Sequence, residues 1–160
     1  MWNARGAGNE ECKANLKEVK KFYTPRIVIV VETRQNEEES CKIIKELGFS
    51  GFYVVGARAF SGGIWFLWDD DMVNISGAVQ SYQAVHAVIT MKQANEPWML
   101  SAVYADPNKQ KRKCLWKEFE ALSHIGDVGW LAVGDFNTIK DVEEKRGGRP
   151  PSVAQLQELS

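Results

Sequence analysis

Five extended patterns follow one another along the middle of the chain, and their close succession limits the folds that the chain can adopt. They cover residues 52–55, 64–68, 73–79, 81–91 and 98–104. The connections between them are short and hold turn residues, as in Ser61-Gly62-Gly63 and Asp69-Asp70-Asp71. Parallel neighbours in a sheet need a crossover of about a dozen residues or more. The spacing therefore predicts antiparallel meanders rather than a purely parallel sheet.

Helical periodicity precedes these strands. A first helix is predicted from apolar residues at helical spacing, which are Cys12, Leu16, Val19 and Phe22. Lysines occupy the opposite face, and Pro25 ends the pattern. The β-branched run at 27–31 then predicts a strand that ends at Glu32.

Two further helices complete the pattern. One is predicted between Asn36, which suits a helix N-cap, and Gly48, which suits a left-handed C-terminal turn. The other covers about residues 109–122 and leads to a last strand at 130–133. Two sheets packed face to face, with the helices outside, account for this order of elements. The expected class is α/β (α+β).

Composition allows a sizeable core and gives no sign of a highly charged binding protein. The chain has 160 residues, of which 44% are hydrophobic, and its formal net charge is -1. An enzyme acting on nucleic acid needs only a local basic rim around acidic groups, so this balance leaves a nuclease open. The three cysteines include no C-x-x-C pair, which favours reduced thiols in an intracellular protein. With no signal peptide and no apolar run longer than 27–31, we expect a soluble protein.

Polar side chains stand at the ends of three predicted strands, where rigid elements commonly present catalytic groups. Asn3 follows the first two residues, Glu32 ends the 27–31 strand, and Asp135 with Asn137 ends the last strand. Glu32 is a hard oxygen ligand that suits Mg²⁺, and Asn3 can hold a metal-bound water or a phosphate oxygen. Asp135 can orient or deprotonate a water that Asn137 directs. The alternative for each residue alone is a solvated or capping group.

Five motifs in this order resemble the endonuclease domain of plant LINE-type (non-LTR) retrotransposons, a branch of the endonuclease/exonuclease/phosphatase superfamily. They are the W-N-x-R-G-x-G-N start at residues 2–9, the I-V-hydrophobic-E-T segment at 27–33, the S-G-G-hydrophobic strand at 61–64, the V-Y strand end at 103–105 and the G-D-F-N motif at 134–137. The tract at 144–150 is also similar to one in the plant elements.

The resemblance implies a four-layer α-β-β-α sandwich of two mixed sheets with outer helices, and metal-assisted hydrolysis of phosphodiesters. By matched position, Glu32 and Asn3 line a Mg²⁺ site, with Mn²⁺ as an alternative, and Tyr104 contacts the scissile phosphate. Asp135 and Asn137 handle the nucleophilic water. The implied partner is DNA, bound by a monomer in the nucleus, with no membrane and no organic cofactor involved.

The family's closing Ser-Asp-His motif has no match, so residues 1–160 are expected to form a single partial domain that lacks its final strands and catalytic histidine. His86 and His124 are predicted in a strand and near a helix end, away from such a motif. The fragment is therefore expected to be a weak or inactive nuclease. An inactive relic that binds nucleic acid weakly and a phosphatase of the same superfamily are the alternatives.

Two basic clusters are candidate substrate contacts. Lys109, Lys111, Arg112 and Lys113 follow Tyr104, and Arg146 and Arg149 flank a glycine pair after the last strand. Contact with the phosphate backbone explains both clusters. A solvated helix start and an exposed loop explain them equally well.

Overall fold

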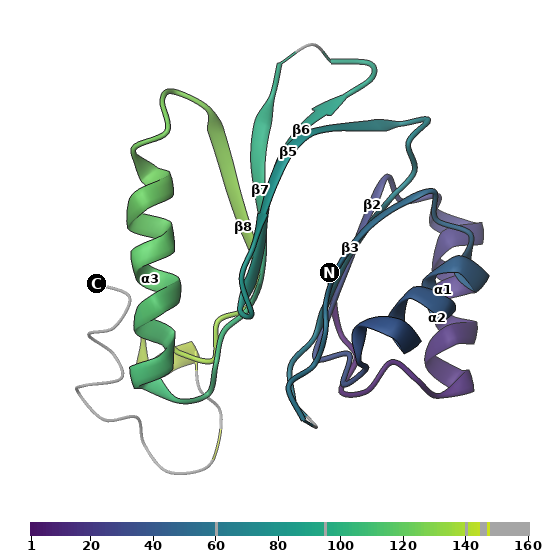
Figure 1. Cartoon of the computed structure of the whole chain (residues 1–160), viewed down its shortest axis with the longest axis horizontal. Helices are drawn as coiled ribbons and strands as arrows, with labels where there is room; N and C mark the ends of the chain where they lie inside the picture. Colours follow the sequence, from purple (N-terminus) through teal and green to yellow (C-terminus); the bar gives the residue numbers. More distant parts are fainter. Residues whose placement is uncertain (60, 95, 140, 145–146, 148–160) are drawn as a thin grey trace.

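Two four-stranded sheets lie face to face between layers of helices (Figure 1). The computed structural model describes residues 1–59, 61–94, 96–139, 141–144 and 147. The first sheet has the order β1-β2-β4-β3, from β1 (Trp2–Asn3), β2 (Ile27–Val31), β3 (Gly51–Val55) and β4 (Ile64–Trp68). The second has the order β5-β6-β7-β8, from β5 (Val73–Gln80), β6 (Ala84–Met91), β7 (Trp98–Tyr104) and β8 (Gly129–Asp135).

Both sheets are mixed, as predicted. The meander from β5 through β7 is antiparallel, and so are the pairs that β4 makes with β2 and β3. Only β1 with β2 and β7 with β8 run parallel among the described strands. The helix α3 (Lys109–Ser123) carries the chain back between β7 and β8, which is the crossover that a parallel pair requires.

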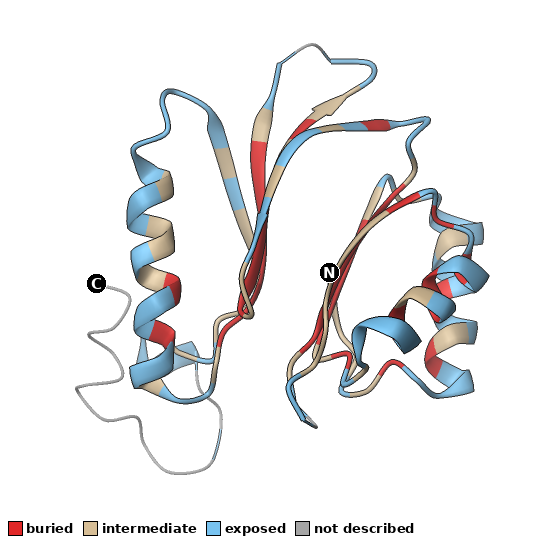
Figure 2. Cartoon of the chain, in the orientation of Figure 1, coloured by how far each residue is buried: buried red, intermediate tan, exposed pale blue. Residues whose placement is uncertain are grey.

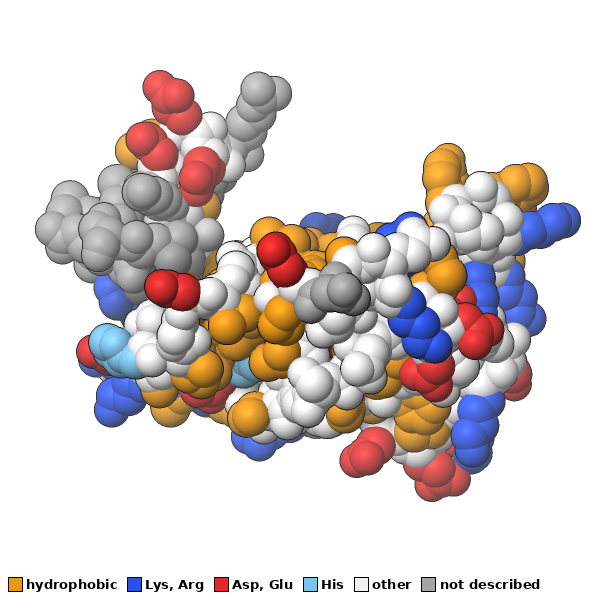
Figure 3. All heavy atoms as spheres, turned by 90° about the horizontal axis from the view of Figure 1, so that it is seen from above, with side chains coloured by type: hydrophobic (Ala, Val, Ile, Leu, Met, Phe, Trp, Pro, Cys, Tyr) orange, Lys and Arg blue, Asp and Glu red, His pale blue; other side chains and the backbone are white. Residues whose placement is uncertain are grey.

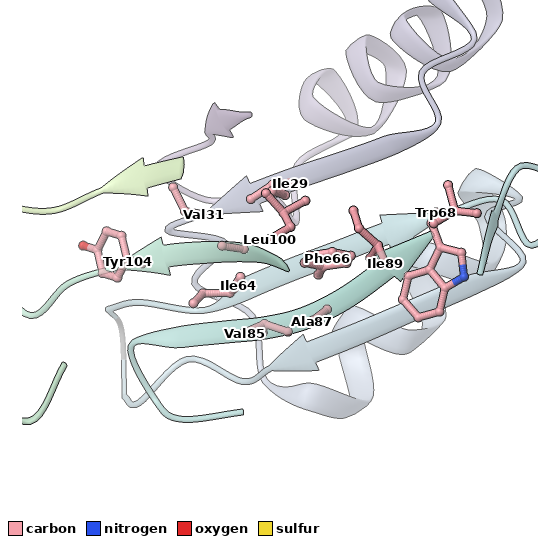
Figure 4. Packing of buried hydrophobic residues seen from close by; sticks show 12 residues of the cluster. Ile29, Val31, Ile64, Phe66, Trp68, Val85, Ala87, Ile89, Leu100 and Tyr104 are labelled. Atoms are coloured by element: carbon pink, nitrogen blue, oxygen red, sulfur yellow. The ribbon is translucent and has the colours of Figure 1, made fainter. Parts of the chain in front are cut away.

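Strand β4 is buried on both faces because all five of its residues are hydrophobic. Ile64, Phe66 and Trp68 point into the core between the sheets (Figure 4). Trp65 and Leu67 point the other way, under the helices α1 (Glu10–Tyr23) and α2 (Glu37–Leu47). A slip of one residue would exchange these two sets, so the register of β4 fixes both layers.

The helices cover the outer faces of the sheets. Buried residues lie on the strands and on the helix faces turned toward them (Figure 2). Seen from above, hydrophobic side chains show between white atoms in the middle of the molecule, and most of the charged side chains lie toward its ends (Figure 3). The helix α2 begins and ends as predicted by residue type, since Asn36 accepts a hydrogen bond from the Glu39 N–H and Gly48 ends α2 in the left-handed region. No helix in the described part of the chain is long and apolar enough to cross a membrane.

Two details of the predicted pattern are wrong. Only Cys12 and Leu16 of the first apolar stripe are buried, whereas Val19 and Phe22 are exposed because the turns beyond Leu16 do not join the core. The strand predicted from residue 81 begins at Ala84, because the Ser81 hydroxyl accepts hydrogen bonds from the N–H groups of Gln83 and Ala84. This local bonding holds a turn where a strand was expected.

His86 is buried on β6, facing α3. Its Nδ1 lies 2.7 Å from the Ser101 hydroxyl, which also accepts a hydrogen bond from the Trp130 indole, and its Nε2 lies 3.4 Å from a Glu118 oxygen. Burial lowers the pKa of His86, although the contact with Glu118 opposes that shift. The ring therefore links the second sheet to α3 in its neutral form.

The stability of the protein should fall as the pH drops below the ordinary histidine pKa of about 6.5. The unfolded chain then binds a proton that the buried His86 resists, and this favours unfolding by up to about 1.4 kcal/mol per pH unit until the lower folded pKa is reached. Urea unfolding at pH 7.5 and 5.5 measures the loss. His86→Gln should reduce it, while His124→Gln is the matched control because His124 is exposed. An equal loss in wild type and His86→Gln would contradict this account.

Candidate active site

The two parallel strand pairs end at one edge of the sandwich, and the predicted site residues lie there. Asn3, Tyr104 and Asp135 are the last residues of β1, β7 and β8, and Tyr104 pairs in register with Asp135. Glu32 comes directly after β2. Because β1 and β2 belong to one sheet and β7 and β8 to the other, the face-to-face packing is what brings these side chains together.

A hydrogen bond between the two sheets defines the centre of the site. The Asn3 amide Nδ2 donates to Asp135 Oδ2 at 3.0 Å, across 132 residues of sequence. The other Asp135 oxygen accepts from the backbone N–H of Asn137 at 3.0 Å. Asn137 has a φ of 48° and donates its own amide to the Ala105 carbonyl at 2.7 Å. Both carboxylate oxygens of Asp135 are thus held in fixed directions.

Glu32 occupies a strained position at the same edge. Its φ is 54°, its side chain is 14% exposed, and its carboxylate forms an ion pair with Arg34. Gly62 and Gly63 hold this segment, since their carbonyls accept from the N–H groups of Arg34 and Thr33. A Cβ at Gly63 would lie 2.1 Å from the Thr33 hydroxyl, so the glycine of the S-G-G motif is required by close packing.

Tyr104 lies at the end of the inter-sheet core with its hydroxyl pointing outward (Figure 4). Burial raises its pKa, and the negative charges of Glu32 and Asp135 raise it further, whereas a hydrogen bond with Asn137 lowers it. The phenol is therefore neutral at physiological pH and can donate a hydrogen bond.

The G-D-F-N motif is explained by close contact between β7 and β8. A Cβ at Gly134 would lie 1.9 Å from the Val103 carbonyl oxygen. Glycine therefore lets β8 approach β7 closely enough to place Asp135 beside Tyr104. Gly134 is needed for the position of the carboxylate rather than for its chemistry.

The predicted substrate contacts differ in their placement. Arg112 is 3% exposed, and its guanidinium donates 2.8 Å hydrogen bonds to the carbonyls of Asp106 and Pro107. It therefore braces the loop after Tyr104, and its burial gives no support to the predicted contact with substrate. Lys109 is half-buried in the first turn of α3, while Arg146 and Arg149 lie outside the described residues.

Neither histidine of the chain lies at the site. His86 is buried between β6 and α3, and His124 is the exposed residue that ends α3. All three cysteines are free, and Cys114 is exposed. The site therefore consists of carboxylates, amides and a phenol.

A pocket of about 390 Å³ adjoins Tyr104, and sequence reasoning did not find it. Its lining includes Arg58, Tyr82, Asp106 and Lys111. Four separate segments supply these residues, so no local spacing could have indicated the pocket. The only signal was that Arg58 precedes the S-G-G motif and that Lys111 belongs to the basic cluster after Tyr104.

The described residues contain no group of three His, Cys, Asp or Glu side chains placed to hold a metal. Mg²⁺ in enzymes takes one or two carboxylates and keeps several waters, so it does not need such a cage. Glu32, with the Asn3 amide beside Asp135, supplies hard oxygen donors of the right kind. The donor set fits Mg²⁺ or Mn²⁺ once the Glu32 carboxylate is released from Arg34.

No protein-family model matches this chain, and no curated protein is similar to it in sequence. Solved structures do match. TDP2 from Danio rerio, complexed with a single-strand DNA product, superposes with a TM-score of 0.64 at 18% identity, over 89% of this chain and 60% of that one. The human Nocturnin catalytic domain with bound sulfate has a TM-score of 0.61 at 14% identity, over 87% and 63%.

An endonuclease/exonuclease/phosphatase family protein from Bacteroides thetaiotaomicron has a TM-score of 0.63 at 13% identity, over 86% of this chain and 62% of that one. The chain thus spans about three fifths of the length of these structures. At such low identity the likeness concerns the architecture. The chain has the fold of the endonuclease/exonuclease/phosphatase proteins, as the order of its sequence motifs predicted.

Proposed function

We propose that this chain carries the first part of a metal-dependent phosphodiesterase site and acts on DNA, in the manner of a LINE-type retrotransposon endonuclease. The observation that supports the proposal is the hydrogen bond from Asn3 to Asp135 across the two sheets, with Tyr104 beside it. It joins two motifs that lie at opposite ends of the sequence. The fold it shares with Nocturnin and TDP2 supports the same reaction class.

Asp135 acts as the base that takes a proton from the attacking water. Its two oxygens are fixed by the Asn3 amide and the Asn137 N–H, so its free lone pairs point in a set direction. Tyr104, kept neutral by burial and by the nearby carboxylates, donates a hydrogen bond from its hydroxyl to a phosphate oxygen and orients the substrate. Positioning by rigid strand ends and electrostatic stabilisation by these groups together supply the advantage over reaction in water.

Glu32 and Asn3 would hold the Mg²⁺ or Mn²⁺ ion. When bound, the metal neutralises charge that develops on the phosphate. In the structure Arg34 pairs with Glu32 and neutralises its carboxylate. Loading the site therefore requires Arg34 to move aside, which its 46% exposed side chain permits.

DNA is the proposed substrate because the ordered motifs resemble nucleases of plant retrotransposons and because TDP2, which has the same fold, was solved with a DNA product. A monomer acting in the nucleus fits that role. We rank a phosphatase of the same fold second. The mannosyl-6-phosphatase of Bacteroides thetaiotaomicron, which superposes with a TM-score of 0.62 at 13% identity, shows that the fold also serves such an enzyme.

Replacing Glu32 by Gln or Asp135 by Asn should abolish the Mg²⁺-dependent nicking of supercoiled plasmid. Each change removes a charge that acts on the reacting phosphate or water, and losses of this kind typically reach about 100-fold to 1000-fold. Glu46→Gln is the matched control, because Glu46 is an exposed glutamate of α2 away from the strand ends. If both site variants still nick the plasmid at the wild-type rate, the activity arises elsewhere in the protein or from a contaminant.

Replacing Arg34 by Met should tighten the binding of Mn²⁺, because the substitution removes the cation that competes for Glu32. For a partly exposed ion pair worth about 0.2–1 kcal/mol, the dissociation constant should fall about 1.5-fold to fivefold. Titration followed by electron paramagnetic resonance measures free Mn²⁺ directly. Arg26→Met, at the other end of β2, is the control of equal charge. If Arg34→Met binds Mn²⁺ as tightly as wild type or more weakly, Glu32 is not a ligand of the metal.

A second candidate function is nucleic-acid binding without turnover. It is favoured by one observation, which is that neither His86 nor His124 reaches the site to contact a phosphate. A chain of this kind would bind DNA with a steep salt dependence and leave it uncut. The plasmid assay above distinguishes the two functions.

A further inference from the structure

The pocket beside Tyr104 is built by three loops and the start of α3, and Gln83 holds them together. Gln83 is 1% exposed. Its backbone carbonyl accepts from the Tyr104 N–H, and its side-chain oxygen accepts from the Asp106 N–H at 2.7 Å. Its amide donates to the Lys111 carbonyl at 3.1 Å. A buried, fully engaged side chain at this point gives the pocket a fixed shape before any ligand arrives.

Arg58 provides the pocket with a positive charge of defined position. A pair of backbone hydrogen bonds with Ser61 holds its loop, and its guanidinium carbon lies 4.4 Å from the centroid of the Tyr82 ring. The Tyr82 hydroxyl in turn donates to the Lys111 carbonyl at 3.3 Å. Stacking on an aromatic ring restrains the guanidinium and leaves its N–H donors available.

The charges around the pocket favour an anionic ligand at Arg58. Lys111 lies 3.6 Å from Asp106, so these two charges largely offset one another. Among the described residues no carboxylate lies within ion-pair distance of Arg58. Tyr82 and Tyr104, whose pKa values are both raised by burial, stay neutral and add no negative charge to the walls.

We propose that this pocket binds the phosphate next to the scissile one in a nucleic-acid strand, with Arg58 as its main ligand. The inference rests on the proposed function for the place of the scissile phosphate at Tyr104, which lines the pocket as well as the active site. A volume of about 390 Å³ suits one nucleotide unit and lies within the range of small-ligand sites. The substrate is therefore a strand with consecutive phosphates rather than a phosphomonoester.

The test compares two labelled ligands, the dinucleoside monophosphate dTpT with one phosphate and the trinucleotide dTpTpT with two. Fluorescence anisotropy in EDTA measures binding without cleavage. Wild type should bind the trinucleotide more tightly. Arg58→Met should weaken the trinucleotide about fivefold to tenfold and leave dTpT within twofold, because only the second phosphate reaches Arg58. For the trinucleotide, the slope of the logarithm of the binding constant against the logarithm of the salt concentration should become less steep by about 0.7.

Arg26→Met removes the same charge from the far end of β2 and should leave both ligands unaffected. Tyr82→Leu should mimic Arg58→Met because Arg58 loses its ring, whereas Tyr82→Phe keeps the ring and should bind as wild type does. Circular dichroism checks that each variant is folded. Equal weakening of both ligands by Arg58→Met, or no weakening, would overturn the pocket assignment.

Failure of the pocket and failure of the proposed function give different results. Binding is measured without metal or turnover, and nicking of plasmid is measured separately. If the chain never cuts DNA but Arg58→Met selectively weakens the trinucleotide, the pocket assignment stands and hydrolysis is refuted. If the chain cuts DNA and the two ligands bind alike in wild type and Arg58→Met, the pocket assignment is refuted.

Discussion

The burial of β4 on both faces is the constraint on which the rest of the structure depends. Its odd and even side chains belong to different cores, one between the sheets and one under the helices. Burying five large apolar side chains contributes on the order of 10 kcal/mol before the entropy of ordering is subtracted. That packing sets how the two sheets face one another, and therefore whether the ends of β1 and β8 can meet.

Much of the fold could be predicted because local chemistry decided it. The short turns required antiparallel meanders, and the residue types at Asn36 and Gly48 placed α2. The errors arose where tertiary packing or side-chain bonding decided instead. Phe22 continues a helical stripe but lies beyond the core, and Ser81 has the pattern of a strand but its hydroxyl holds a turn.

The candidate site, like the fold, has residues that the sequence could predict and others that it could not. Asn3, Glu32, Tyr104 and Asp135 could be proposed from the sequence because each ends a strand within a specific motif, and the structure brings all four to one edge. Arg112 could not be separated from its neighbours by sequence, since its burial depends on how the loop after Tyr104 folds back. The pocket at Arg58 depends on contacts between distant loops, which no spacing reveals.

Backbone strain links the two halves of the site. Six non-glycine residues in the described part of the chain have positive φ, and Arg5, Glu32, Arg34, Ala59 and Asn137 among them belong to the site or to segments beside it. Each such conformation costs roughly 1 kcal/mol or more and persists only where surrounding packing enforces it. Two of these residues, Glu32 and Asn137, lie beside Asp135 and Tyr104, so the packing that enforces their backbone conformation also fixes their place at this edge. The strain is thus the local consequence of holding carboxylate, amide and phenol groups together, at an edge where a Cβ at Gly63 or Gly134 would collide with Thr33 or Val103.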